Sequence, residues 1–238
     1  MSFRLGTISG IPIRLHWLFL VLVAIVLLRN GMAAGSGAAL DALTLLGILF
    51  GSVVLHELGH AVTARRFGAK VVDITLWPLG GLTRMTQMPE RAIPEVCVAI
   101  AGPAVNALLL GIGILLGGAV STPWRRPDDL PIFTPPTLLD VFTSVNFALA
   151  AFNLAPAFPM DGGRALRGAL SARSGYLHAT ELAVRIGRWF AVLAVFAAWF
   201  YTDLLIPVLL IAFFFGSRGR RSWPTCARAM ASTLSRTS

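Results

Sequence analysis

The sequence predicts an α-helical polytopic membrane protein with about six transmembrane helices and short membrane-associated β-strands near residues 10–16 and 71–86. Hydrophobic residues make up 56% of the 238 residues, and the mean hydropathy is +0.75. Only 13% of the residues are charged, about half the fraction in soluble domains. Several apolar runs approach the roughly 20 residues that a helix needs to cross a bilayer.

Six apolar runs are candidates for these helices. They cover residues 16–28 with a weak extension to 34, then 39–64, 94–119, 136–156, 186–200 and 204–215. The first run and the last two are shorter than a full crossing requires. Connections are brief, so we expect one membrane domain over residues 1–216, followed by a basic cytoplasmic tail over residues 217–238.

The first run also fits the three-part pattern of a cleaved signal peptide. Arg4 and Arg14 precede the apolar residues 17–28, and small residues follow at 32–39. We favour a membrane span, because the segment GIPIRLHW precedes the apolar run where a signal peptide would have a short basic leader.

Lysine and arginine are distributed unevenly between the two sets of loops that six spans create. Seventeen of the 20 basic residues fall in the set that includes both termini, and the other set holds only Arg29, Arg125 and Arg126. Basic residues of short loops stay on the cytoplasmic side, so both termini are predicted to be cytoplasmic. The net charge of +9 then faces anionic lipid rather than nucleic acid.

The motif HELGH, at residues 56–60, places two histidines and an acid within an apolar run. His56 and His60 are four residues apart, so on a helix both imidazoles lie on one face and can bind one metal ion. Glu57 lies beside them, where it can take a proton from water and return it to a leaving amine. A solvated helix can carry the same string by chance, but residues 51–64 contain no other ionisable residue. This context favours a catalytic zinc ion.

A catalytic zinc ion usually has three protein ligands, and Asp161 is the best candidate for the third. It lies in NLAPAFPMDGGR, residues 153–164, where Pro156 and Pro159 interrupt the fourth run. Irregular backbone at membrane depth is tolerated where it lines a cavity. The glycines 162 and 163 predict a sharp turn directly after the acid. Other candidates, which we interpret as interfacial residues, are His16, Glu90, Glu95, His178 and Glu181.

HELGH together with N-x-x-P-x-x-P-x-D-G-G-R resembles the site-2 protease family of intramembrane zinc metalloproteases, in its prokaryotic branch without PDZ insertion or evident CBS domain. GIPIRLHW, WPLGG and AGPAVN also resemble family features. The resemblance implies that His56, His60 and Asp161 bind one Zn²⁺ and that Glu57 is the catalytic base and acid. It implies that Asn153 acts near the scissile peptide, although this amide could instead satisfy the broken backbone.

The resemblance also implies a multi-pass protein of a prokaryotic plasma membrane that cleaves within or near the transmembrane segment of a single-span protein. Residues 10–16 and 71–86 are then expected to form a small sheet whose edge pairs with unwound substrate; an ordinary amphipathic loop fits the same residues. Asn106 and Asn146 are interpreted as helix-packing residues. The alternative function is a zinc-binding transporter or sensor without proteolysis, which would have no use for Glu57. A homo-oligomer or a gating partner is compatible with the sequence.

Overall fold

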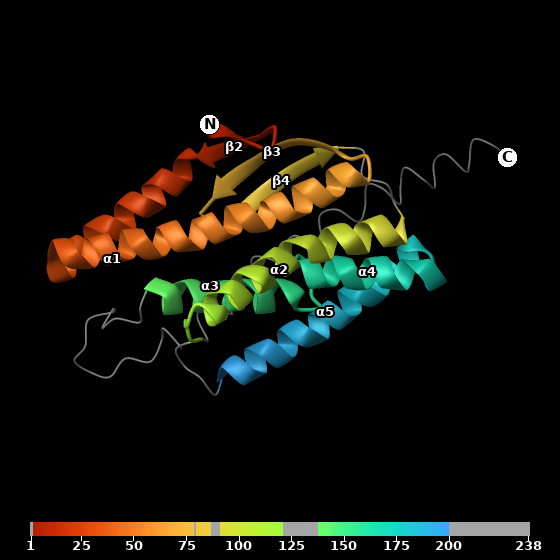
Figure 1. The fold of residues 1–238 in the computed structure, drawn as a ribbon. Coiled ribbons are helices and arrows are strands. Elements are labelled where there is room, and N and C mark those ends of the chain that lie inside the picture. The colour runs from red at the N-terminus through yellow and green to blue at the C-terminus, as the bar shows by residue number, and fades with distance from the viewer. Residues whose placement is uncertain (1, 79, 87–90, 121–137, 200–238) are drawn as a thin grey trace.

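The computed structural model describes residues 2–78, 80–86, 91–120 and 138–199. The elements are β1 (Ser2–Ile8), β2 (Ile11–His16), α1 (Trp17–Arg66), β3 (Lys70–Trp77), β4 (Gly80–Thr86), α2 (Ala92–Leu115), α3 (Leu138–Leu154), α4 (Asp161–Ser174) and α5 (Tyr176–Trp199). The sheet lies on one side of α1, and the other helices lie on the opposite side (Figure 1). The expected helical fold with a small sheet is therefore confirmed. The sixth run and the basic tail lie outside the described residues.

Helix α1 contains the first two predicted runs as two arms. Its backbone leaves the helical conformation at Ala34 and at Gly35, which has a φ of 83°. This positive φ favours glycine, because a side chain would clash with the backbone there, and the chain reverses at this point (Figure 1). By length and composition, α1 and α2 are able to cross a membrane, whereas α3 is shorter.

The four strands form one sheet in the order β1-β2-β3-β4. Neighbouring strands are antiparallel except for β2 and β3, which are parallel. Alternating residues give the sheet two faces. The inner face of the sheet packs on the second arm of α1 through apolar residues. The sheet contributes Ile11, Ile13, Leu15, Ile74 and Leu76, and the helix contributes Val53, Val54, Leu58 and Ala61. The outer face carries Arg14, Asp73 and Arg84.

Strand β1 was missing from our expectation, because its side chains are almost all exposed and show no buried face. It pairs with β2 through a tight turn at Ser9 and Gly10, both with positive φ. Backbone hydrogen bonds to β2 therefore form a strand that the pattern of side chains does not predict.

Two expectations after the fourth run were wrong. Gly162 and Gly163 do not form a turn but lie in the first helical turn of α4, pressed against the backbone of residues 154–158. Helix α5 begins at Tyr176, ten residues before the predicted start at 186. Arginines read as loop residues, such as the exposed Arg185 and Arg188, belong to the polar side of this helix.

Candidate metal centre

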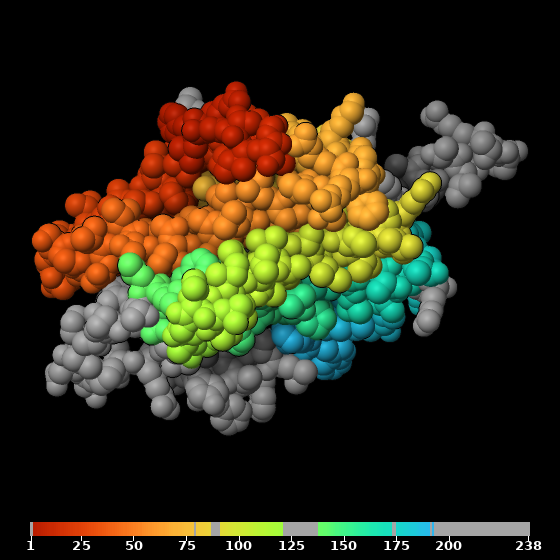
Figure 2. All heavy atoms as spheres, in the orientation of Figure 1, coloured from red at the N-terminus to blue at the C-terminus, as the bar shows by residue number. Residues whose placement is uncertain are grey.

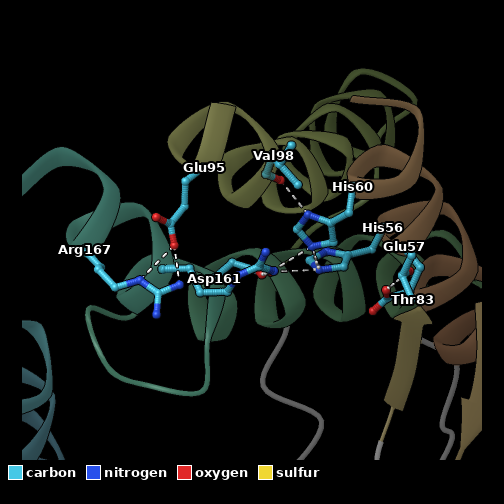
Figure 3. Close-up of polar contacts among 9 residues, drawn as sticks. His56, Glu57, His60, Thr83, Glu95, Val98, Asp161 and Arg167 are labelled. Atoms are coloured by element: carbon cyan, nitrogen blue, oxygen red, sulfur yellow. Dashed lines mark hydrogen bonds and ion pairs between the residues drawn. The ribbon is translucent and has the colours of Figure 1, made fainter. Parts of the chain in front are cut away.

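Three side chains predicted as metal ligands converge between α1 and α4. His56 Nε2 lies 3.1 Å from Asp161 Oδ2, and His60 Nε2 lies 3.0 Å from the same oxygen. The two Nε2 atoms are 3.0 Å apart. All three residues are buried, and Figure 3 shows them facing a common point.

Close packing of α2 against α1 brings the helical backbone up to the histidines. A Cβ atom at Gly102 of α2 would collide with both imidazole rings, and one at Gly59 of α1 would lie 2.7 Å from the carbonyl oxygen of Ala101. Small residues permit such an approach between helices. In Figure 2, α2 lies directly along α1, so this helix covers the histidine pair from one side.

The three side chains fit a zinc ion. Ligand atoms bound at about 2.0–2.1 Å in a tetrahedral site lie about 3.3 Å apart, close to the spacings of 3.0–3.1 Å found here. Two imidazole nitrogens and one carboxylate oxygen are typical of catalytic zinc sites. The second carboxylate oxygen, Asp161 Oδ1, lies 3.6 Å from Arg164 Nη1, which leaves Oδ2 directed at the histidines.

The remaining ring nitrogen of each histidine is held by α2. His56 Nδ1 donates to Asn106 Oδ1 over 2.5 Å, and His60 Nδ1 donates to the carbonyl oxygen of Val98 over 2.7 Å. Such contacts select the tautomer that leaves Nε2 available as a ligand and orient the ring. Helix α2 therefore aligns both imidazoles, although none of the three converging side chains belongs to it.

A chain of hydrogen bonds extends from Asn106 to two further helices. Asn106 Nδ2 donates to Asn146 Oδ1 on α3 over 2.9 Å, and Asn146 Nδ2 donates to Ser52 Oγ on α1 over 3.2 Å. The expected interhelical packing role of both asparagines is confirmed. The contact of Asn106 with His56 was missed, although Asn106 follows Gly102 by four residues and so shares its face of α2.

Glu57 points away from the three converging side chains and toward the sheet (Figure 3). Thr83 Oγ1 of β4 donates a hydrogen bond to Glu57 Oε2. Gly81, two residues earlier on the same face of β4, leaves room for the Glu57 side chain, because a Cβ atom there would overlap it. The sequence analysis did not single out Thr83. Its spacing of two residues from Gly81 places both residues on one face of the strand, and this was the available signal.

The other candidates have different partners. Asn153 Nδ2 donates to the carbonyl oxygen of Leu149 over 2.9 Å, so its catalytic role stays a prediction. Glu95 forms an ion pair with Arg167 and accepts a hydrogen bond from it. His16 Nδ1 accepts from the backbone of Leu18, and its ring stacks on Trp77. Glu90 lies outside the described residues, whereas His178 and Glu181 are exposed on α5.

The family model for "Peptidase family M50" matches residues 44–123 and 130–194. The chain belongs to peptidase family M50. All three converging side chains, Glu57 and Asn106 lie within the matched ranges, so the resemblance to site-2 proteases is confirmed.

Individual relatives agree with this family. The chain is 36% identical over 216 residues to a zinc metalloprotease of Methanocaldococcus jannaschii, covering 91% of this chain and 59% of that protein. It is 29% identical over 137 residues to the stage IV sporulation protein FB of Bacillus subtilis, covering 57% of this chain and 41% of that protein. The chain thus spans about half the length of these curated relatives.

A solved structure shows that the fold is shared as well. The site-2 protease from Methanocaldococcus jannaschii aligns with a TM-score of 0.62 at 33% identity. The alignment covers 92% of this chain and 94% of that one. The described part of the chain therefore shares its fold with this site-2 protease.

Proposed function

We propose that this chain is a zinc-dependent intramembrane endopeptidase. Its substrate is a single-span membrane protein, cut within or near the transmembrane segment. The observation that carries the proposal is the convergence of His56, His60 and Asp161, with Glu57 next to His56 in the sequence. The relatives named zinc metalloproteases support it.

In the proposed reaction, His56, His60 and Asp161 hold one zinc ion. When bound, this ion supplies Lewis-acid polarisation of the scissile carbonyl and of water. Glu57 takes a proton from the attacking water as its oxygen bonds to the carbonyl carbon. The same carboxyl then protonates the amide nitrogen as the C–N bond breaks, which releases an amine and a carboxylate.

Asn153 is proposed to stabilise the oxyanion that forms during the attack. A side-chain amide has two N–H donors. One N–H of Asn153 donates to the carbonyl oxygen of Leu149. The second N–H has no partner among the described residues, and it is the proposed donor to the substrate oxyanion. Removing an oxyanion donor elsewhere costs about 3 kcal/mol of transition-state stabilisation.

Strand β4 is the proposed docking site for the unwound substrate. A transmembrane helix engages all of its carbonyls, so a peptide bond must leave the helix before it can be cut. Among the described residues, β4 pairs with β3 on one side only. The backbone of Gly81 and the hydroxyl of Thr83 both lie against Glu57. A substrate strand added to this edge would pass next to the catalytic acid.

We also propose that residues 1–216 form one membrane domain with six crossings. Both termini and the basic tail, residues 217–238, would be cytoplasmic in a prokaryotic plasma membrane. Large apolar side chains are exposed along α1, including Ile25, Leu28 and Met32. Exposed apolar surface of this extent is expected of a helix that faces lipid.

Proteolysis of a tagged single-span substrate by purified protein tests the proposal. We expect cleavage by the wild-type chain and none by Glu57→Gln, which keeps the side-chain shape but cannot transfer the proton. Equal cleavage by both proteins would refute the role of Glu57. Zinc binding by both proteins without any cleavage would favour the transporter or sensor.

A further inference from the structure

Asp161 is the first residue of α4, so its position depends on how that helix is held. The preceding residues form tight turns: the backbone N–H of Ala157 donates to Ala155 over 2.7 Å, and that of Met160 donates to Ala157 over 2.9 Å. Met160 precedes α4 without a side-chain cap. The placement of the carboxylate is therefore decided mainly by the packing of α4 itself.

An ion pair between Arg167 and Glu95 attaches α4 to α2. Arg167 Nε donates to Glu95 Oε1 over 2.8 Å, and Arg167 Nη2 donates to the same oxygen. Glu95 is only 5% exposed. The guanidinium carbon of Arg167 lies 5.2 Å from the centroid of the Phe158 ring and 5.0 Å from the centroid of the Tyr176 ring. At these distances a cation interacts with an aromatic face.

This arginine therefore contacts three parts of the molecule that surround the acidic ligand. Glu95 belongs to α2, Phe158 belongs to the turns before Asp161, and Tyr176 begins α5. Arg167 follows Asp161 by six residues, which is about 9 Å along a helix. Figure 3 shows the ion pair between α2 and α4 on the side of Asp161 opposite the histidines.

The same segment of α2 also supports the imidazole ring of His60 on α1. Val98, whose carbonyl oxygen accepts from His60 Nδ1, lies one helical turn after Glu95. One helical turn of α2 therefore connects the carbonyl that supports the His60 ring to the carboxylate that supports α4. Through this connection, α2 determines how far the His60 imidazole lies from the Asp161 carboxylate.

We propose that Glu95 and Arg167 are positioning residues that hold Asp161 at the distance that zinc binding requires. Ligand distances in a metal site vary by only about 0.2 Å, so a small shift of α4 weakens the site. Contacts outside the ligand set change metal affinity by about 10–100-fold in other proteins. The inference rests on the metal centre of the proposed function but not on proteolysis, since zinc binding is measured without substrate.

The test compares zinc binding by full-length wild-type protein with that of Glu95→Gln, Arg167→Lys and the double variant. Gln keeps the shape of Glu95 without its charge, and Lys keeps the charge of Arg167 without its planar fork. We expect the zinc Kd to rise about tenfold in each single variant. The double variant should bind no more weakly than a single one, because the two residues act as a pair.

Arg185→Gln is the matched control, because Arg185 is exposed on α5 outside this ion pair, and it should bind zinc as the wild type does. If Glu95→Gln does not fold, Arg167→Lys carries the test with both charges retained. A wild-type Kd in the folded variants would overturn the proposal.

Cobalt(II) substitution separates positioning from a general loss of stability. The visible spectrum of bound cobalt reports the ligand geometry, because metal geometry follows the donor arrangement. We expect an altered spectrum in both single variants. An unchanged spectrum and zinc Kd would overturn the proposal even if the melting temperature of the metal-free protein fell. Absence of proteolysis in the wild type would refute the proposed function and leave this inference standing.

Discussion

Thr83 on β4 donates a hydrogen bond to the carboxylate of Glu57 on α1. The two residues are 26 positions apart in the sequence, and they join the sheet to the helix that carries HELGH. The contact orients the proposed catalytic base from the strand on which substrate is proposed to dock.

Replacing Thr83 by Val removes this hydrogen bond with little change in volume. We expect kcat for cleavage to fall about tenfold or more, since a hydrogen bond to a charged group is worth about 1.5–3 kcal/mol. Thr83→Ser should retain most of the activity, because the hydroxyl remains. Zinc content should be unchanged in both variants, because Thr83 contacts no proposed ligand.

Thr86→Val is the control for this prediction. Thr86 lies on the same strand, and its hydroxyl donates to the carbonyl oxygen of Lys70 rather than to Glu57. Equal kcat values for the Thr83 and Thr86 variants, measured with one tagged substrate, would contradict an orienting role for Thr83.

Replacing Gly102 by Ala should disrupt the metal centre. The added Cβ would overlap both imidazole rings, so the rings must rotate or α2 must move away. We expect the zinc stoichiometry, measured by elemental analysis, to fall well below that of the wild type. Gly111→Ala on the same helix is the control, because nothing lies within 4 Å of its added Cβ. Equal zinc content in the two variants would be incompatible with this packing.

Replacing Asp161 by Ala should remove the third proposed ligand. We expect zinc content and cleavage to fall together, whereas Glu57→Gln should lose cleavage and keep its zinc. Elemental analysis of both purified variants distinguishes a ligand from a proton-transfer residue. Unchanged zinc in Asp161→Ala would assign the third ligand to another residue.

The ion-pair cluster on the outer face of the sheet predicts loss of stability in acid. Hydrogen bonds from Arg84, and to a smaller extent from Arg14, hold the pKa of Asp73 below its ordinary value, against the opposing effect of burial. A lowered pKa means that the carboxylate stabilises the folded state above the unfolded pKa of about 3.9. This contribution is lost as the pH falls from about 4 through the lower folded pKa.

Melting temperatures measured between pH 3 and 7 test this prediction. Asp73→Asn should be less stable than the wild type near neutral pH. The difference should shrink as the pH falls from about 4 through the lowered folded pKa, because the Asp73 carboxylate then becomes protonated. Asp41→Asn on α1 is a control carboxylate outside the sheet. A constant difference between Asp73→Asn and the wild type at every pH would refute this assignment.

Local patterns were sufficient to predict much of the site. Helical periodicity places His56 and His60 on one face, and the position of Glu57 beside them follows from the same geometry. Pro156 and Pro159 marked the end of the fourth run, and α3 ends at Leu154 just before them. The lengths of the apolar runs predicted the two arms of α1 and the helix α2. The predicted number of six helices stays a prediction, because the sixth run lies outside the described residues.

Long-range partners could not be predicted in this way. Glu95 was one of several acids near an interface, and its binding to Arg167, 72 residues later, depends on how α4 docks on α2. The contact between His56 and Asn106 likewise depends on the close approach that Gly102 allows. Helix α4 itself was missed, because its two leading glycines are typical of turns and their close fit against residues 154–158 is a tertiary contact.

By itself, the sequence determined the residues that are proposed to carry the chemistry, because spacing along one helix and breaks in apolar runs are local properties of the chain. Only the tertiary structure decided which side chains orient His56, Glu57 and Asp161, since many polar residues are equally able to pair until the helices pack. The physical reason is that packing of small residues sets the distances between elements, and a hydrogen bond forms only over a distance of about 3 Å.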